Sequence, residues 1–238
     1  MEPISLIIIL TLLAGIAMPV GAGIASLEHI RPYWLENELR HGIIAFGGGA
    51  LLSAVGLVLV PDAIKNLSLL PACGYFLLGG VCFMLLDIIL YKINTPASQL
   101  AAMLADFIPE SIALGAAFAM GEGSGFLLAG LIALQNLPEG FNAYRELKES
   151  SDYTNFKVIS LFSLLALFGP AAGLIGYFYL AQQTHFLSAI MLFAAGGILY
   201  SVFQDIAPQA KLNKHWLPTL GAVLGFALGL AGFMMTHA

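Results

Sequence analysis

Two stretches, LADFIPES at residues 104–111 and LQNLPEG at residues 134–140, place acidic residues and a proline within otherwise apolar sequence. Of the 238 residues, 59% are hydrophobic and only 10% are charged, whereas a soluble domain carries about 25% charged residues. We therefore expect an integral membrane protein. In such a protein Asp106, Glu110 and Glu139 lie where burial of a charge is most costly.

Eight segments are apolar and long enough for membrane helices, which need about 20 residues each. Their connections are short and polar, so that no soluble domain remains. The fold predicted is an all-α integral membrane protein with a single transmembrane domain over residues 1–238. The first segment has no basic amino-terminal region and exceeds the usual apolar core of a signal peptide, which favours a first span. The predicted spans are residues 4–25, 42–61, 73–91, 99–120, 126–144, 157–180, 186–208 and 217–235.

Lysine and arginine are distributed unevenly between the two faces that these spans define. Of nine cations, Lys65 alone falls at the second, fourth or sixth connection. Cytoplasmic loops carry such an excess of Lys and Arg. We therefore expect both termini outside the cytoplasm, and the compactness of the chain favours the inner membrane of a prokaryote. The eight remaining cations are Arg31, Arg40, Lys92, Arg145, Lys148, Lys157, Lys211 and Lys214.

The chain contains two internal matches. AFGGGALLSAVGLVLVPDA (45–63) matches LFAAGGILYSVFQDIAPQA (192–210) when the prolines are aligned. DFIPES (106–111) matches QNLPEG (135–140), with the PE dipeptides aligned. By the predicted topology, the two members of each matched pair cross the membrane in opposite directions. Such inverted repeats are typical of secondary transporters.

Oxygen-bearing side chains recur at helical spacing in the fourth and fifth spans. Asp106 and Glu110 are four residues apart, as are Gln135 and Glu139, so each pair shares one helix face. The short connection GEGSG makes the two spans antiparallel neighbours, and the four side chains can then converge. No Lys or Arg lies deep enough to pair with the carboxylates, so they need protons, water or a cation.

The chemistry of this cluster favours a hard cation. It contains carboxylates and an amide but no Cys or His, which favours Mn, Mg, Ca or Fe(II) over Cu(I) and leaves zinc compatible. Pro109 and Pro138 each remove a backbone donor, and we expect each helix to open beside its carboxylates.

Other polar and small residues of the spans have weaker assignments. Packing is the favoured role of Asp87 and Asn142. Gln204 either supports Asp205 or bonds to a facing helix. A glycine stripe at Gly221, Gly225 and Gly229 permits close packing with the same chain or with a second copy, so a homodimer stays open.

The paired PE motifs resemble the ZIP (Zrt-, Irt-like) family of divalent metal transporters, whose fourth and fifth spans each carry a form of HNxPEG. The resemblance covers the whole chain, including eight spans, external termini and an acidic residue three before the proline that ends the seventh span. It implies movement of divalent cations toward the cytoplasm by displacement of one helix group against another. It implies a first metal position at Asp106, Glu110, Gln135 and Glu139, and a second at Asn136, Glu139 and Asp205, with Glu110 as a bridge.

The chain departs from that motif at three positions. Asp106 stands where the family has histidine, Phe107 where it has a polar residue, and Ser111 where it has glycine. Phe107 cannot ligate a metal, which weakens the second position. Asp106 makes the first position harder and more anionic, which favours Mn or Fe(II) relative to zinc.

We expect a transporter rather than an enzyme. Its cargo would be a divalent cation such as Zn, Mn, Fe or Cd, with the lipid bilayer as its surroundings, no prosthetic group and no nucleic-acid partner. A proton-coupled carrier of a small organic solute is the alternative, because carboxylates within spans suit proton relays. An intramembrane hydrolase is a weaker alternative, because neither a GxGD motif around the aspartates nor a Ser/His pair occurs in the spans.

Overall fold

The computed structural model describes residues 2–27, 38–93, 95–119, 124–180, 182–213 and 215–236. These residues form helices and their connections, with no strand among them. Arg31 and Lys214, two of the cations on which the predicted orientation rests, lie outside the described residues.

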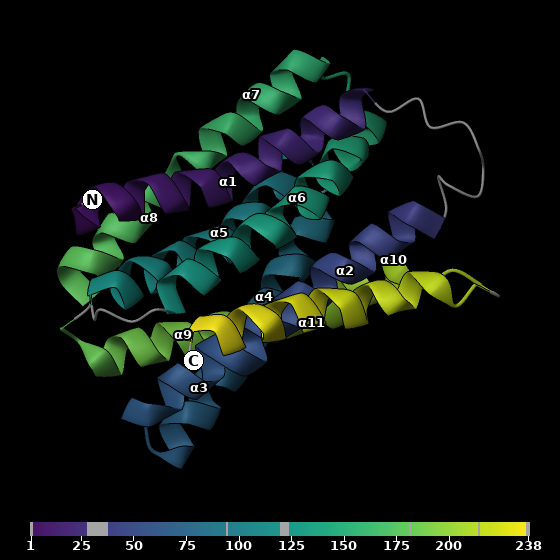
Figure 1. The fold of residues 1–238 in the computed structure, drawn as a ribbon. Coiled ribbons are helices and arrows are strands. Elements are labelled where there is room, and N and C mark those ends of the chain that lie inside the picture. Colours follow the sequence, from purple (N-terminus) through teal and green to yellow (C-terminus); the bar gives the residue numbers. More distant parts are fainter. Residues whose placement is uncertain are drawn as a thin grey trace.

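Eight helical segments follow one another within the described residues (Figure 1). Three of them are interrupted, so that α2 (Arg40–Ser53) continues into α3 (Val60–Ala63), α7 (Asn155–Ala166) into α8 (Phe168–Ile175), and α9 (Thr184–Ser201) into α10 (Ala207–Ala210). The remaining segments are α1 (Pro3–Leu27), α4 (Leu69–Ile93), α5 (Pro96–Ala119), α6 (Ser124–Ser150) and α11 (Leu217–Thr236).

Six of these segments are long and apolar enough to cross a membrane, by their length and composition. They are α1, α4, α11 and the three interrupted segments, whereas α5 and α6 carry the two PE motifs. The exterior is apolar, with Leu70 of α4 and Leu224 of α11 among many exposed large side chains, while Glu110 and Gln135 are buried. An apolar exterior, with the few buried polar groups enclosed among helices, suits a lipid solvent, so the expected helical membrane architecture is confirmed.

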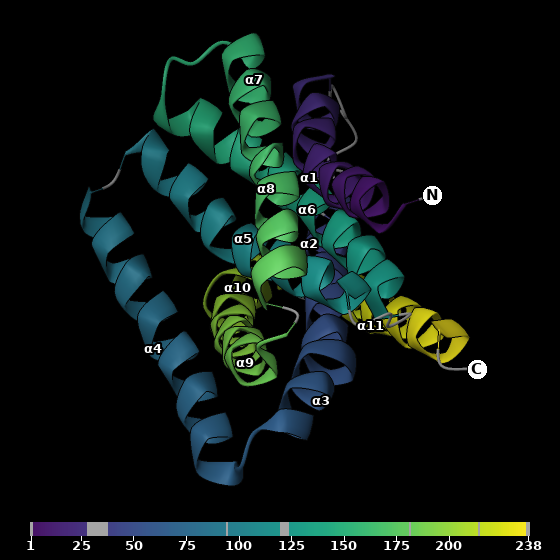
Figure 2. The ribbon, with the colours of Figure 1, turned by 90° about the vertical axis from the view of Figure 1, so that its left-hand side faces the viewer.

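The helices form two groups. The first bundle consists of α1, α5, α6 and the α7–α8 segment; the second consists of the α2–α3 segment, α4, the α9–α10 segment and α11. In Figure 1, α1 and α7 lie above α9 and α11, and α3 lies at the bottom. Figure 2 shows α4 along one flank of the molecule.

The pairing of helices repeats within each bundle. In the first, α1 packs most extensively on α6, and α8 packs on α5; in the second, α2 packs on α11, and α9 packs on α4. Exchanging α1 with α7–α8, α2–α3 with α9–α10, α4 with α11 and α5 with α6 leaves this pairing unchanged. The α2–α3 and α9–α10 segments also run in opposite directions (Figure 1). The arrangement therefore has the form that the predicted inverted repeat requires.

Glycines allow the backbones of α2 and α11 to touch. A Cβ added at Gly225 would clash with the carbonyl oxygen of Phe46, and one added at Gly49 would clash with that of Ala222. Close packing of this kind is what small residues at helix crossings permit. The predicted glycine stripe of α11 thus packs against α2 of the same chain, through Gly221, Gly225 and Gly229.

The crossing of α9 with α4 reproduces this contact. A Cβ added at Gly79 would clash with the carbonyl oxygen of Phe193, and one added at Gly196 would clash with that of Phe76. In the alignment of the two matched segments, the phenylalanine and the glycine of α9 fall on the phenylalanine and the glycine of α2. The sequence match therefore marks residues that make equivalent backbone contacts.

A π-helical turn precedes the terminal proline in both repeats. It covers Ala54–Leu59 before Pro61 in the α2–α3 segment, and Val202–Ile206 before Pro208 in the α9–α10 segment. Proline lacks a backbone donor, and its ring collides with the carbonyl four residues earlier, so the preceding turn widens. By contrast, α5 and α6 run through Pro109 and Pro138 as continuous helices, so the expected opening at these two prolines does not occur.

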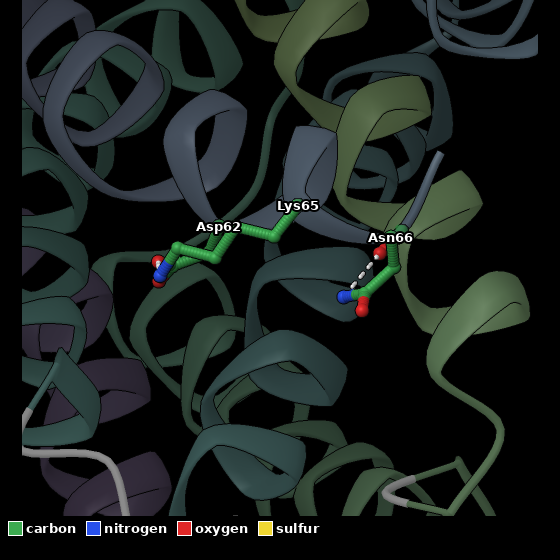
Figure 3. A network of polar contacts seen from close by, with 4 residues as sticks. Asp62, Lys65 and Asn66 are labelled. Atoms are coloured by element: carbon green, nitrogen blue, oxygen red, sulfur yellow. Dashed lines mark hydrogen bonds and ion pairs between the residues drawn. The ribbon is translucent and has the colours of Figure 1, made fainter. Parts of the chain in front are cut away.

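Residues at the end of the α2–α3 segment make polar contacts within the segment and with α9 (Figure 3). Lys65 Nζ donates to Asp62 Oδ1 at 2.6 Å, and Asn66 Nδ2 donates to Ser188 Oγ of α9 at 3.4 Å. The cation that stands apart from the predicted charge asymmetry therefore has a carboxylate partner on its own helix.

Replacing Gly79 by Ala should destabilise the protein by about 1–3 kcal/mol, because the new methyl group would force the backbones of α4 and α9 apart. Unfolding of the purified protein in mixed detergent micelles would measure this change. Gly74→Ala is the matched control on the same helix, since a Cβ there meets nothing within 4 Å. Equal stability of the two variants would contradict the backbone contact.

Candidate metal-binding site

Two buried hydrogen bonds join α5 and α6. Gln135 Nε2 donates to Glu110 Oε1 at 2.7 Å and to Glu110 Oε2 at 2.6 Å. Both residues are almost completely buried, at 3% and 1% exposure. The aligned PE motifs place Gln135 on Asp106 and Glu139 on Glu110, so this contact joins the two copies of the shorter repeat.

A cavity of about 210 Å³ lies beside this pair, between the two bundles. Its walls come from α5 and α6 on one side and from α2, α4 and the α9–α10 segment on the other. Among the described residues, no Lys or Arg lines it. Five carboxylates do: Asp87, Asp106, Glu139, Glu146 and Asp205.

Three oxygen atoms around this cavity are buried and have no hydrogen-bond partner. They are Asp106 Oδ1, Gln135 Oε1 and Asn142 Oδ1, and all three residues line the cavity. A buried acceptor without a donor costs about 1–3 kcal/mol. Such oxygens suit a species that supplies positive charge or protons, such as a cation or water.

The cavity reaches one face of the protein. Its lining includes Ile44 near the start of α2, Leu90 near the end of α4, Glu146 near the end of α6, and Gln209 of α10. At the opposite side, a Cβ added at Gly232 of α11 would lie 2.6 Å from Leu127 of α6. The polar centre is thus connected to the face that carries most of the described cations, and α6 packs against α11 on the other side.

Four of the six predicted metal ligands line this cavity: Asp106, Gln135, Glu139 and Asp205. Glu110 does not line the cavity. Its carboxylate instead accepts the two hydrogen bonds from Gln135. Asn136 is also outside the lining, since its Nδ2 donates to the carbonyl oxygen of Ala14 in α1 at 2.9 Å.

Phe107 is fully buried on the α1 and α8 side of α5. Its ring fills the space that a Cβ at Gly15 or at Gly169 would occupy. This aromatic side chain therefore packs within the first bundle.

Asp205 lies in the π-helical turn of the α9–α10 segment, where the repeat alignment places it on Val58 of the other segment. The same widened turn is thus polar in one copy and apolar in the other. Asp87, Glu146 and Asp205 all line the cavity, so the widened turn contributes to the same acidic wall as α4 and α6.

Sequence reasoning undervalued several residues of the cavity. Asp87 accepts a hydrogen bond from the hydroxyl of Tyr200 at 3.1 Å, and both residues line the cavity. On α6, the spacing of Glu139, Asn142 and Glu146 by three and then four residues places them on one helix face, which could have identified them. No sequence pattern identifies Asp87 of α4 as a cavity residue, because its position depends on which face of α4 packs against α9.

The donors offered by the cavity are carboxylate and amide oxygens, which suit hard divalent cations. Within the part of the chain that the structure describes, no three His, Cys, Asp or Glu side chains are grouped closely enough to hold a metal ion. Comparison of the sequence with protein-family models and with curated proteins finds no match.

A double-mutant cycle should detect the contact between Gln135 and Glu110. An intramolecular hydrogen bond contributes about 0.5–1.5 kcal/mol, and two of them join these side chains, so Gln135→Ala and Glu110→Ala should be coupled by about 1–3 kcal/mol. The measurement is the free energy of unfolding in detergent of both single variants and the double variant. Asn136→Ala combined with Glu110→Ala is the control, because these side chains share no partner and should give additive effects.

Proposed function

We propose that this protein carries divalent transition-metal cations of the Zn, Mn and Fe class across a membrane. The observation that carries the proposal is the cavity with five carboxylates and three unpartnered buried oxygens, and without Lys or Arg in its described lining. A charged group at the centre of a membrane helix costs about 2.5–3.5 kcal/mol on the insertion scale. A cation bound in the cavity would offset the burial of Asp106 and Glu139 together.

The symmetry of the fold supports alternating access as the mode of movement, and the family resemblance favours movement toward the cytoplasm. The cavity leads toward the face with most of the cations, which the positive-inside rule assigns to the cytoplasm, with both termini outside. Alternating access would arise if the first bundle moved against the second, so that the cavity closed on this face while a corresponding one opened beside Leu127 and Gly232. Import into a prokaryotic cytoplasm through a ZIP-like mechanism is the form of this proposal that the paired PE motifs favour.

The metal preferred should be hard. The cavity presents Asp106, Glu139 and amide oxygens, and its described lining includes no Cys or His, which favours Mn or Fe(II) over softer ions. An organic solute is less well supported, because ligand pockets typically hold about 300–1,000 Å³ and this cavity is smaller. Its described lining also lacks a cationic partner for an anionic solute.

Uptake of Mn, Fe(II), Zn, Co and Cd into proteoliposomes tests the proposal. We expect wild-type protein to favour Mn or Fe(II), and Asp106→His to move the preference toward Zn, because imidazole is a softer ligand than carboxylate. Transport of none of these metals by wild-type protein would overturn the proposal and favour the organic-solute alternative.

Replacing Glu139 by Ala should abolish uptake while leaving the helical fold intact, because this carboxylate lines the cavity at the centre of α6. Flux through the reconstituted variant, with circular dichroism as the check on folding, measures the effect. Full activity of Glu139→Ala would exclude the central site as the route.

A further inference from the structure

Among the residues of the cavity, Asn142 is the one that a packing role explains least well. The residue lines the cavity, and its Oδ1 is buried and has no hydrogen-bond partner. Asn136, on the same helix, shows how an amide is used for packing, because its Nδ2 is bonded to the Ala14 carbonyl oxygen of α1. An unpartnered amide oxygen destabilises the metal-free protein, so a role in holding a ligand accounts for Asn142 better than packing does.

The hydrogen bonds of Gln135 determine which oxygens remain for a cation. Because Nε2 of Gln135 donates to both carboxylate oxygens of Glu110, that carboxylate is occupied and lies outside the cavity lining. The amide oxygen of Gln135 is left without a partner, as are Asp106 Oδ1 and Asn142 Oδ1. Glu139 lies one helical turn before Asn142 and lines the same cavity.

Resting on the proposed function, we infer that Asn142 supplies its side-chain oxygen as a ligand to the transported cation when the cavity is open as in this structure. The ligand set is then Asp106, Glu139 and Asn142, without Glu110, because Asn142 lies one helical turn from Glu139 but about two turns from Gln135. Two carboxylates balance the charge of a divalent ion, and the neutral amide adds a donor without adding charge. Such all-oxygen sets, completed by water, suit Mn²⁺ better than softer ions.

Binding of Mn²⁺ to the full-length protein in detergent tests this assignment without transport. The loss of the free Mn²⁺ electron paramagnetic resonance signal gives the affinity, and competition with Cd²⁺ gives the selectivity. Asn142→Leu keeps the approximate size and removes the oxygen, and it should weaken Mn²⁺ binding roughly tenfold or more, with a smaller loss for Cd²⁺. Asn142→Asp retains an oxygen donor and should keep Mn²⁺ affinity within a few-fold of wild type or increase it.

Two controls separate this inference from the proposed function. Gln204→Leu removes an amide that lines a groove between α4 and α9 outside the cavity, and it should bind Mn²⁺ as wild type does. Glu139→Ala should lose binding. Wild-type affinity in Asn142→Leu, with binding lost in Glu139→Ala, would overturn the role of Asn142 and leave the proposed function standing.

Two further outcomes also decide the matter. Equal losses in Asn142→Leu and Asn142→Asp would assign the effect to side-chain shape and overturn the inference. Absence of binding by wild-type protein to Mn²⁺ and Cd²⁺ alike would overturn the inference and the proposed function together.

Discussion

A carboxylate buried in apolar surroundings needs a donor, a proton or a cation, and this requirement organises the centre of the molecule. Glu110 meets it with two hydrogen bonds from Gln135. Asp106 and Glu139 instead line a cavity in which Asp106 Oδ1, Gln135 Oε1 and Asn142 Oδ1 have no hydrogen-bond partner. Because the Nε2 of Gln135 is bonded to Glu110, the amide oxygen of Gln135 is left as a free acceptor beside the cavity.

The two bundles place this centre between surfaces that differ in rigidity. Within each bundle, glycines bring backbones into direct contact, as at Gly115 against Gly173 in the first bundle and at Gly225 against Phe46 in the second. Between the bundles lie the cavity and contacts made by longer side chains. Packing of backbone on backbone resists sliding more than a solvated, polar boundary does, so the boundary between bundles is where relative movement is least costly.

The internal repeat supplies two similar halves, and the differences between them give the cavity its chemistry. Both halves contain a π-helical turn before a proline, yet one places Asp205 there and the other Val58. The helices α4 and α11 occupy equivalent places in the two halves. Asp87 of α4 lines the cavity, whereas α11 packs against α2 through its glycine stripe. A symmetric backbone therefore carries an acidic residue in one half where the described equivalent in the other half is apolar.

The sequence by itself determined the helical membrane architecture, because its composition leaves too few charges for a soluble surface. It also placed Asp106, Gln135 and Glu139 near one another, because helical spacing and a short connection leave little freedom. The tertiary structure alone decided that Asn136 turns toward α1, that Asn142 and Asp87 line the cavity, and that the α11 glycines pack within the chain. These outcomes depend on how far each helix rotates about its axis, and that rotation is set by packing against helices distant in sequence.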